Sequence, residues 1–223
     1  MTPSVTAVIV AAGSSTRMGI PKQFLPLNGR PLIAYTLAAF EQCAAIDAIV
    51  VVARKEDHDR VWEIARIGDI TKLSTIVVGG RTRGESVRNG VDKCKTDYVA
   101  IHDGARPLVT PTLIERVVRA AVQHGAATAA VHTKDTVKIA DQNGMVLSTP
   151  DRTTLWNVQT PQVFSKDLYE RAWQYASTRG RDVTDDCQLI EAIGQPVKLV
   201  EGCYTNIKVT TPEDVPFAEE LLK

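Results

Sequence analysis

Short apolar segments rich in β-branched residues alternate along this chain with segments that have helical spacing. The segment VTAVIV at 5–10 comes first, a helical pattern follows at 31–43, and the residues at 49–53 are apolar without interruption. An uninterrupted apolar run is typical of a strand that helices cover on both faces. The same patterns predict strands at 75–78, 98–101 and 126–131 and helices at 56–67, 85–94 and from Pro111 onward. The alternation predicts an α/β fold with a doubly wound, mainly parallel sheet.

Residues 132–159 interrupt this alternation. Two short alternating runs flank Asn143-Gly144, a pair typical of a hairpin turn. A hairpin of this length needs a surface to cover it. The sequence leaves two possibilities, an arm that packs on a second copy of the chain or packing on the chain's own domain. The remaining patterns predict helices at 166–178 and 184–193, strands at 197–201 and 206–209, and a last helix from Thr211 with a distorted first turn at Pro216.

The composition is that of an ordinary globular protein. Of 223 residues, 44% are hydrophobic and 23% are charged, and no Gly/Ser-rich linker divides them. We therefore expect a single domain over 1–223 with a β-hairpin arm at about 132–150. Lys plus Arg equals Asp plus Glu at 26 each, which argues against a nucleic-acid partner. The apolar runs are too short for a membrane span, so no membrane partner is expected.

The N-terminus and the cysteines bear on localisation. No charged segment precedes the first apolar run, so we expect no signal peptide. The four cysteines are scattered without a CxxC pair, which predicts reduced thiols in a cytoplasmic protein. The four histidines have no HxxxH or HExxH spacing, which argues against a metal site built from His.

The loop after the first strand reads AAGSSTRMGIPK, at 11–22. Arg17 and Lys22 supply positive charge, and small residues would let backbone N–H groups approach a phosphate. The loop is neither a Walker A loop, because Gly13 and Gly19 are one residue too far apart, nor a GxGxxG loop. A flexible surface loop with two solvated cations is the alternative. The small residues that open the loop are Ala11, Ala12, Gly13 and Ser14.

Two further polar segments follow predicted strands. Parallel sheets bind ligands outside the carboxyl ends of their strands, so these segments rank high as candidates. GGRTRGESVRNG, at 79–90, fits either a base- or ribose-binding loop or a glycine turn before a capped helix. HDGARP, at 102–107, places Asp103 three residues before Arg106. That pair fits a Mg²⁺ ligand beside a phosphate, or an ion pair that organises a turn.

The C-terminal half contains three more polar positions of interest. Arg152 and Thr160 lie in the largely apolar stretch around Trp156, and Lys208 interrupts a strand pattern. Arg152 and Lys208 would form a second anion site if both pointed into the pocket, although a Lys in a strand usually faces water. Asp185-Asp186 looks like a metal motif, but we favour a helix cap formed by Thr184 or Asp185.

Taken together, these stretches resemble the 2-C-methyl-D-erythritol 4-phosphate cytidylyltransferase family. The similarity runs from about residue 5 to about residue 220. Its motifs, in order, are AAGSSTRMG with PKQ, GGRTRGESV, HDGARP, KDT, RTTLWNVQTPQ, TDD and TNIKVTTPEDV. The opening motif is shared with sugar-nucleotide pyrophosphorylases and other nucleotidyltransferases, whereas the ordered set is specific. The resemblance implies a Rossmann-like nucleotidyltransferase fold.

The resemblance also implies an activity and an assembly. The family transfers CMP from CTP to 2-C-methyl-D-erythritol 4-phosphate, releases pyrophosphate and serves the non-mevalonate route to isoprenoids. It uses a divalent metal, usually Mg²⁺. In this family the hairpin is an arm that embraces a second subunit, so a homodimer is expected and Thr136 would serve the neighbour's site.

Residue roles follow from the motif matches. Arg17 and Lys22 would hold the triphosphate and stabilise the transition state, and Asp103 would ligate the metal. The expected CTP-binding residues are Ala11, Ala12, Gly13, Ser14, Gly80, Arg83, Ser86, Asp103 and Gly104. The expected acceptor-binding residues are Arg106, Thr136, Arg152, Thr160 and Lys208. No general base is needed, because the attacking phosphate is already ionised at neutral pH.

Three alternatives stay open on sequence alone. A ribitol-5-phosphate cytidylyltransferase has the same fold and chemistry, but KDT and LWNVQTPQ favour methylerythritol phosphate. A non-catalytic nucleotide-binding module would be expected to lack Arg17, Lys22 or Asp103, and all three are present. A Rossmann dehydrogenase would need the glycines that the first loop lacks.

Overall fold

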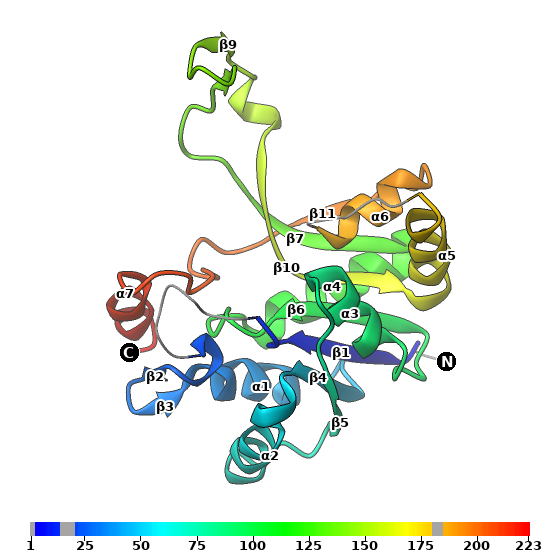
Figure 1. The fold of residues 1–223 in the computed structure, drawn as a ribbon, viewed down its shortest axis with the longest axis vertical. Helices are drawn as coiled ribbons and strands as arrows, with labels where there is room; N and C mark the ends of the chain where they lie inside the picture. The colour runs from blue at the N-terminus through cyan, green and yellow to red at the C-terminus, as the bar shows by residue number, and fades with distance from the viewer. Residues whose placement is uncertain (1–2, 14–20, 180–184) are drawn as a thin grey trace.

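The computed structural model describes residues 3–13, 21–179 and 185–223. Its centre is a seven-stranded sheet in the order β11-β7-β10-β6-β1-β4-β5 (Figure 1). Its strands are β1 (Val5–Val10), β4 (Ala48–Ala53), β5 (Leu73–Val78), β6 (Tyr98–Asp103), β7 (Ala126–His132), β10 (Trp156–Ser165) and β11 (Lys198–Glu201). Strand β10, which the sequence patterns missed, is antiparallel to β6 and β7, and the other pairings are parallel. The predicted mainly parallel α/β sheet is confirmed.

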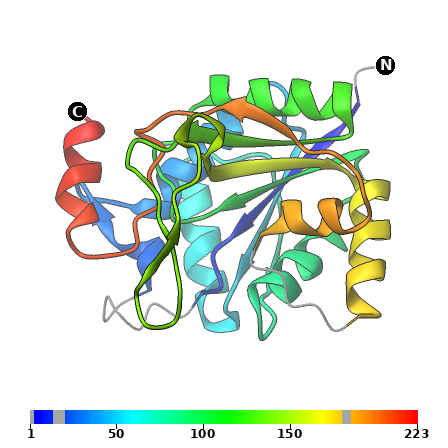
Figure 2. The same ribbon diagram turned by 90° about the horizontal axis from the view of Figure 1, so that it is seen from above.

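Helices cover both faces of this sheet. They are α1 (Leu32–Gln42), α2 (His58–Ile67), α3 (Arg83–Val91), α4 (Pro111–His124), α5 (Lys166–Ser177) and α6 (Asp186–Ala192). Helix α7 (Asp214–Leu221) packs instead on Leu27 and Val209. Figure 2 shows α4 along one face and α3, α5 and α6 along the other. Within the described residues, no helix is long and apolar enough to cross a lipid bilayer.

Alternate side chains of the central strands enter two separate hydrophobic cores. In β1, Ala7 and Ile9 pack with residues of α1 and α4, whereas Val8 packs with residues of α3. This is the two-sided burial that the uninterrupted apolar runs predict. The approach of α3 is close, because a Cβ on Gly90 would lie 2.5 Å from a methyl carbon of Val8.

The order of the strands creates a switch point at the middle of the sheet. From β1 the chain proceeds outward through β4 and β5, and then returns to β6 on the other side of β1. In open α/β sheets, the crevice at the carboxyl ends of the strands beside such a point binds ligands. Here those ends are Val10 in β1 and Asp103 in β6, which pair in register.

A hairpin projects from the sheet between β7 and β10 (Figure 1). It contains the strands β8 (Ile139–Ala140) and β9 (Val146–Ser148) and the short 3-10 helix η3 (Arg152–Thr154). Its turn includes Gly144 at φ 80°, and every residue from 134 to 149 is exposed. The hairpin therefore does not pack on its own domain.

A smaller hairpin was not predicted from the sequence. Strands β2 (Pro26–Leu27) and β3 (Arg30–Pro31) pair around Asn28 and Gly29, whose φ angles of 47° and 77° suit a tight two-residue turn. The pair Asn-Gly was the available signal. The hairpin covers a small third core with α7, built from Leu25, Leu27, Leu32, Val209 and Ala218.

The predicted strand at 206–209 is wrong. The segment follows β11 without joining a β-ladder, and its Val209 N–H donates to the carbonyl of Ala105 at 2.9 Å. The side chain of Val209 is buried in the third core, so packing on a loop and a helix holds this segment instead of strand pairing.

The last two helices begin later than predicted. Helix α6 begins at Asp186, and the preceding Asp185 accepts a hydrogen bond from Gln162 Nε2 and makes no side-chain cap bond; Thr184 lies outside the described residues. Helix α7 begins at Asp214, after a turn at 211–213. Pro216 therefore lies in the first helical turn, where a backbone N–H has no partner within the helix.

Candidate active site

A cavity of about 520 Å³ lies at the carboxyl ends of β1, β5 and β6. Each loop that the sequence singled out after a strand contributes to its lining. The predicted site residues found there are Ala11, Ala12, Gly13, Lys22, Gly80, Arg83, Ser86, Asp103, Gly104 and Lys208. Sequence reasoning missed Val10, Gln23, Arg81, Thr82 and Ala105. Ser14 and Arg17 lie outside the described residues.

Small residues are required where the cavity loops meet. A Cβ on Gly79 would lie 2.3 Å from Cβ of Ala12, and one on Gly104 would lie 3.2 Å from Cβ of Ala11. Two backbone hydrogen bonds fix the positions of these loops. Ala11 N–H donates to Val52 O at 2.7 Å, and Gly104 N–H donates to Val10 O at 2.9 Å. The small side chains of Ala11 and Ala12 therefore let three loops pack together at one edge of the sheet, whereas the space beside Gly13 is open.

The first turn of α3 forms one wall of the cavity. Thr82 caps the helix, with its Oγ1 accepting from Glu85 N at 3.1 Å. Ser86 Oγ donates to Thr82 O at 2.9 Å and accepts from Gly80 N at 3.0 Å. The Ser86 hydroxyl thus ties the Gly80 loop to the helix, whose positive dipole end lies at the cavity and favours an anion there.

Asp103 lies at the centre of a cluster of cations. Its Oδ2 is 3.1 Å from Lys208 Nζ and 3.4 Å from Arg106 Nε, and its Oδ1 is 3.7 Å from a terminal nitrogen of Arg83. Burial alone would raise the pKa of Asp103, but these cations outweigh it and lower the pKa to about 2. The carboxylate is therefore charged at neutral pH.

His102 and Thr160 support Asp103 from beneath. Complete burial lowers the pKa of His102 to about 3, so its ring is neutral. The ring Nε2 lies 3.3 Å from the Arg106 carbonyl, which can only accept, so Nε2 carries the proton and Nδ1 accepts from the Thr160 hydroxyl at 2.9 Å. Thr160 Oγ1 in turn accepts from Asp103 N at 3.2 Å. The buried Thr160 hydroxyl therefore positions Asp103, and Thr160 itself does not line the cavity.

The segment at 206–209 is fixed so that Lys208 reaches Asp103. Asn206 is fully buried, and its Nδ2 donates to Thr160 O at 2.9 Å. Arg106 donates to the carbonyl of Asn206 at 2.9 Å. The predicted acceptor-binding residues Arg106 and Lys208 are thereby brought to one side of Asp103.

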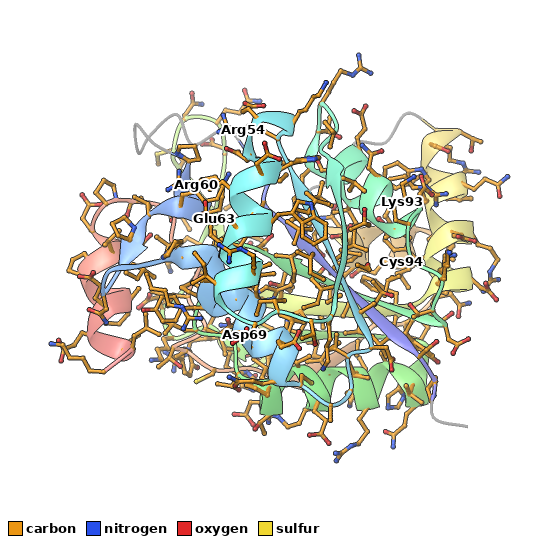
Figure 3. All side chains as sticks on the ribbon, turned by 90° about the horizontal axis from the view of Figure 1, so that it is seen from below. Arg54, Arg60, Glu63, Asp69, Lys93 and Cys94 are labelled. Atoms are coloured by element: carbon orange, nitrogen blue, oxygen red, sulfur yellow. The ribbon has the colours of Figure 1, made fainter. Side chains whose placement is uncertain are left out.

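Lys22 begins the 3-10 helix η1 (Lys22–Phe24), which a second network anchors. The buried Gln23 donates from Nε2 to Asp57 Oδ2 at 3.2 Å, and Asp57 also accepts from Arg54 Nε at 2.8 Å. The guanidinium of Arg60 stacks 4.1 Å from the ring centre of Phe24. Figure 3 labels Arg54 and Arg60, which lie before and within α2. Helix α2 and the turn before it thus hold the segment that carries Lys22 at the cavity.

Thr136 and Arg152 do not reach the cavity of their own chain. Both are exposed on the projecting hairpin, where Arg152 donates to the carbonyl of Lys134 at 2.9 Å. The base of the hairpin is tied to the loop that leads to Lys208, because the Tyr204 hydroxyl donates to His132 O at 2.9 Å. Lys134 Nζ also lies 3.7 Å from the centre of the Tyr204 ring.

The cavity offers a limited set of metal ligands. Among the described residues there is no cluster of three or more Asp, Glu, His or Cys side chains, and Asp103 is the one carboxylate in the described lining. Mg²⁺ typically takes one or two carboxylates and completes its shell with waters and substrate phosphates. A single ionised Asp beside a cavity of about 520 Å³, which has room for a nucleotide and its phosphates, fits that mode of binding, and a site built from protein ligands alone does not.

The fold and the cavity define the class of the protein. A doubly wound sheet, small-residue loops at its switch point and cations around one carboxylate are the features of an α/β nucleotidyltransferase. The 2-C-methyl-D-erythritol 4-phosphate cytidylyltransferase (IspD) family model matches residues 5–223. The chain therefore belongs to the 2-C-methyl-D-erythritol 4-phosphate cytidylyltransferase family.

Individual relatives agree with this assignment. A protein of this name from Desulforamulus reducens is 46% identical over 99% of this chain and 96% of its own length. One from Caldanaerobacter subterraneus subsp. tengcongensis is 45% identical over 99% of each chain. The crystal structure of the 4-diphosphocytidyl-2C-methyl-D-erythritol synthase from Anaerococcus prevotii superimposes with a TM-score of 0.89, at 34% identity, over 99% of this chain and 96% of that one.

The charge of Asp103 has a measurable effect on stability. A carboxyl whose pKa is lowered on folding adds stability above the unfolded-state pKa of about 3.9, and that stability is lost as the pH falls through the folded-state value. We expect Asp103→Asn to lower the free energy of unfolding by about 2 kcal/mol at pH 7 and by roughly half as much at pH 3. Urea unfolding at both pH values measures the difference.

Asp69→Asn, at an exposed position away from the hairpin whose φ of 52° suits Asn equally, is the matched control and should change stability at neither pH. An equal loss for Asp103→Asn at pH 7 and pH 3 would contradict the ion-pair explanation.

Proposed function

We propose that this protein transfers CMP from CTP to 2-C-methyl-D-erythritol 4-phosphate with release of pyrophosphate, a step of the non-mevalonate route to isoprenoids. The observation that carries the proposal is the cluster of Lys208, Arg106 and Arg83 around Asp103, beside a nucleotide-sized cavity. Two polyanions must meet in this reaction, and the cluster supplies fixed positive charge on both sides of one carboxylate. Family membership over nearly the whole chain supports the same reaction.

The nucleotide is assigned to the side of the cavity formed by the loop at 11–13 and the first turn of α3. The acceptor phosphate is assigned to Arg106 and Lys208 on the other side. An oxygen of that phosphate attacks the α-phosphorus of CTP in line, and the bond to the β-phosphate oxygen breaks with its electron pair leaving on pyrophosphate. Lys22 and Arg17 counter the charge that develops on the triphosphate, as preorganised donors do in phosphoryl transfer.

Mg²⁺ is the proposed cofactor, and other divalent cations could replace it. Asp103 is the residue that would hold it, together with oxygens of the nucleotide phosphates. When bound, the ion would neutralise phosphate charge and help to orient the triphosphate. The protein residues do the remaining work of binding and orientation.

A homodimer is the proposed assembly. The hairpin exposes apolar side chains at Ile139, Met145, Val146 and Leu147, and it places Thr136 and Arg152 away from their own cavity. An arm that crosses to a second subunit would cover these side chains and bring the two polar residues to the neighbour's acceptor site. A cytoplasmic location is part of the proposal, and the four free thiols support it.

The first test is pyrophosphate release with CTP and Mg²⁺, in parallel reactions with 2-C-methyl-D-erythritol 4-phosphate and D-ribitol 5-phosphate. We expect turnover with the first acceptor alone. Turnover with ribitol 5-phosphate alone would support the assigned CTP site and show that the acceptor is ribitol 5-phosphate. Silence with both acceptors, in the presence of CTP binding, would favour a non-catalytic nucleotide-binding module.

The two lysines should have separable kinetic effects. Lys22→Ala should lower kcat by about 10²–10³, because a donor that acts mainly on the transition state is lost. Lys208→Ala should raise the KM for the acceptor and leave the KM for CTP within about two-fold, because it removes an acceptor anchor. Steady-state kinetics with each substrate varied in turn measures both. Near-normal turnover of Lys22→Ala, or equal damage to CTP binding by Lys208→Ala, would contradict these roles.

The crossed arm predicts complementation between inactive variants. Heterodimers of Lys22→Ala with Arg152→Ala, isolated with two different tags, should contain one intact site in two and show about half of the wild-type activity. Heterodimers of Lys22→Ala with Lys208→Ala are the matched control, since both residues line the cavity of one chain. Assayed at an acceptor concentration far below the KM of Lys208→Ala, they should show no recovery. Equal activity of the two heterodimers would place Arg152 in the site of its own chain.

A further inference from the structure

Asp186 is a buried carboxylate that lies against the wall of the cavity without lining it. Only 1% of its side chain is exposed, and its Oδ2 is 2.6 Å from a terminal nitrogen of Arg83. The Tyr169 hydroxyl donates to its Oδ1 at 3.4 Å. The sequence presented this residue as part of a helix start, but its side chain points to a different helix.

Arg83 has two carboxylate partners with different geometry. One guanidinium nitrogen donates to Asp186 at 2.6 Å, and the other lies 3.7 Å from Asp103, beyond hydrogen-bonding distance. The Arg83 side chain remains partly exposed to the cavity that it lines, whereas Asp186 is sealed from solvent. The pair with Asp186 is therefore the fixed contact, and the contact with Asp103 is the one that a ligand could replace.

The chemistry of the two groups supports this division. A guanidinium has five N–H donors in a rigid plane, so one edge can bind a carboxylate while another edge faces a phosphate. A buried carboxylate without its cation is strongly disfavoured, so Asp186 keeps Arg83 within reach whatever occupies the cavity. A side chain that is held in advance loses less conformational entropy when a ligand binds.

We propose that Asp186 is a positioning residue for the nucleotide: it holds the Arg83 guanidinium at the cavity wall, so that Arg83 can exchange Asp103 for CTP without leaving its place. The inference rests on the proposed function, because it assigns CTP to the α3 side of the cavity. Asp186 itself contacts no substrate. The exchange also frees one oxygen of Asp103 when the nucleotide arrives.

A purely structural role is the competing explanation. Arg83 and Asp186 are the first residues of α3 and α6, so their ion pair also joins two helices. A structural role predicts lower stability with unchanged nucleotide affinity of the folded protein. A positioning role predicts weaker CTP binding that depends on the presence of Arg83.

The test uses Asp186→Asn in the full-length protein. We expect CTP, titrated calorimetrically with Mg²⁺ and without acceptor, to bind about ten-fold more weakly, with the acceptor KM within about two-fold of wild type. Tyr169→Phe is the matched control, because it removes the other partner of Asp186 and leaves the ion pair in place. It should bind CTP as the wild type does.

A double variant separates the two explanations. In the Arg83→Gln background, Asp186→Asn should weaken CTP binding by less than about two-fold further, because its effect passes through Arg83. A full ten-fold further loss in that background, or unchanged CTP affinity in folded Asp186→Asn, would overturn the proposal. If Asp186→Asn does not fold, Asp186→Glu, which keeps the charge and displaces it by one methylene, should still weaken CTP binding, and wild-type affinity there would overturn it as well.

Failure of the proposed function looks different in the same experiment. In that case the wild-type protein itself binds no CTP. Failure of the present inference leaves wild-type CTP binding intact and makes the Asp186 variants indistinguishable from it.

Discussion

The ion cluster at Asp103 is the interaction on which the site depends. Three cations from distant parts of the chain converge on one carboxylate, with Arg83 from α3, Arg106 from the loop after β6 and Lys208 from the segment after β11. Without a central negative charge these cations would repel one another in a partly buried space. Asp103 thus lets the folded protein keep an anion-binding site assembled before any anion binds.

Much of this arrangement could be predicted from the sequence because of a property of parallel sheets. The carboxyl ends of β1, β5 and β6 lie on one edge, so polar residues directly after those strands must be neighbours. This logic brought together the loop at 11–13, Gly80 and Asp103. The apolar strand patterns carry the prediction, because the central strands are buried on both faces and therefore occur in the sequence as short apolar runs rich in β-branched residues.

The remaining parts depend on contacts that no local pattern reveals. Asp186 forms an ion pair with Arg83, which lies 103 residues earlier in the chain. In the sequence, Asp186 follows Asp185 at a helix start, so the two aspartates resemble an ordinary helix cap. The sequence pattern predicts a strand around Lys208, but the segment is held by hydrogen bonds of the buried Asn206 and by packing of Val209. The buried hydroxyl of Thr160 resembles a ligand-binding group in sequence, yet in the fold it is occupied between Asp103 and His102.

The two sides of the cavity are coupled through the same carboxylate. Arg83 approaches one oxygen of Asp103 from the side of α3, and Lys208 and Arg106 approach the other oxygen. An anion that binds the Arg83 nitrogen nearest Asp103 leaves Asp103 less neutralised, although Asp186 keeps the guanidinium in place. The carboxylate then holds Lys208 and Arg106 more strongly. The charge of Asp103 thus couples the two sides of the cavity, because a new partner for one oxygen changes how strongly the other oxygen holds Lys208 and Arg106.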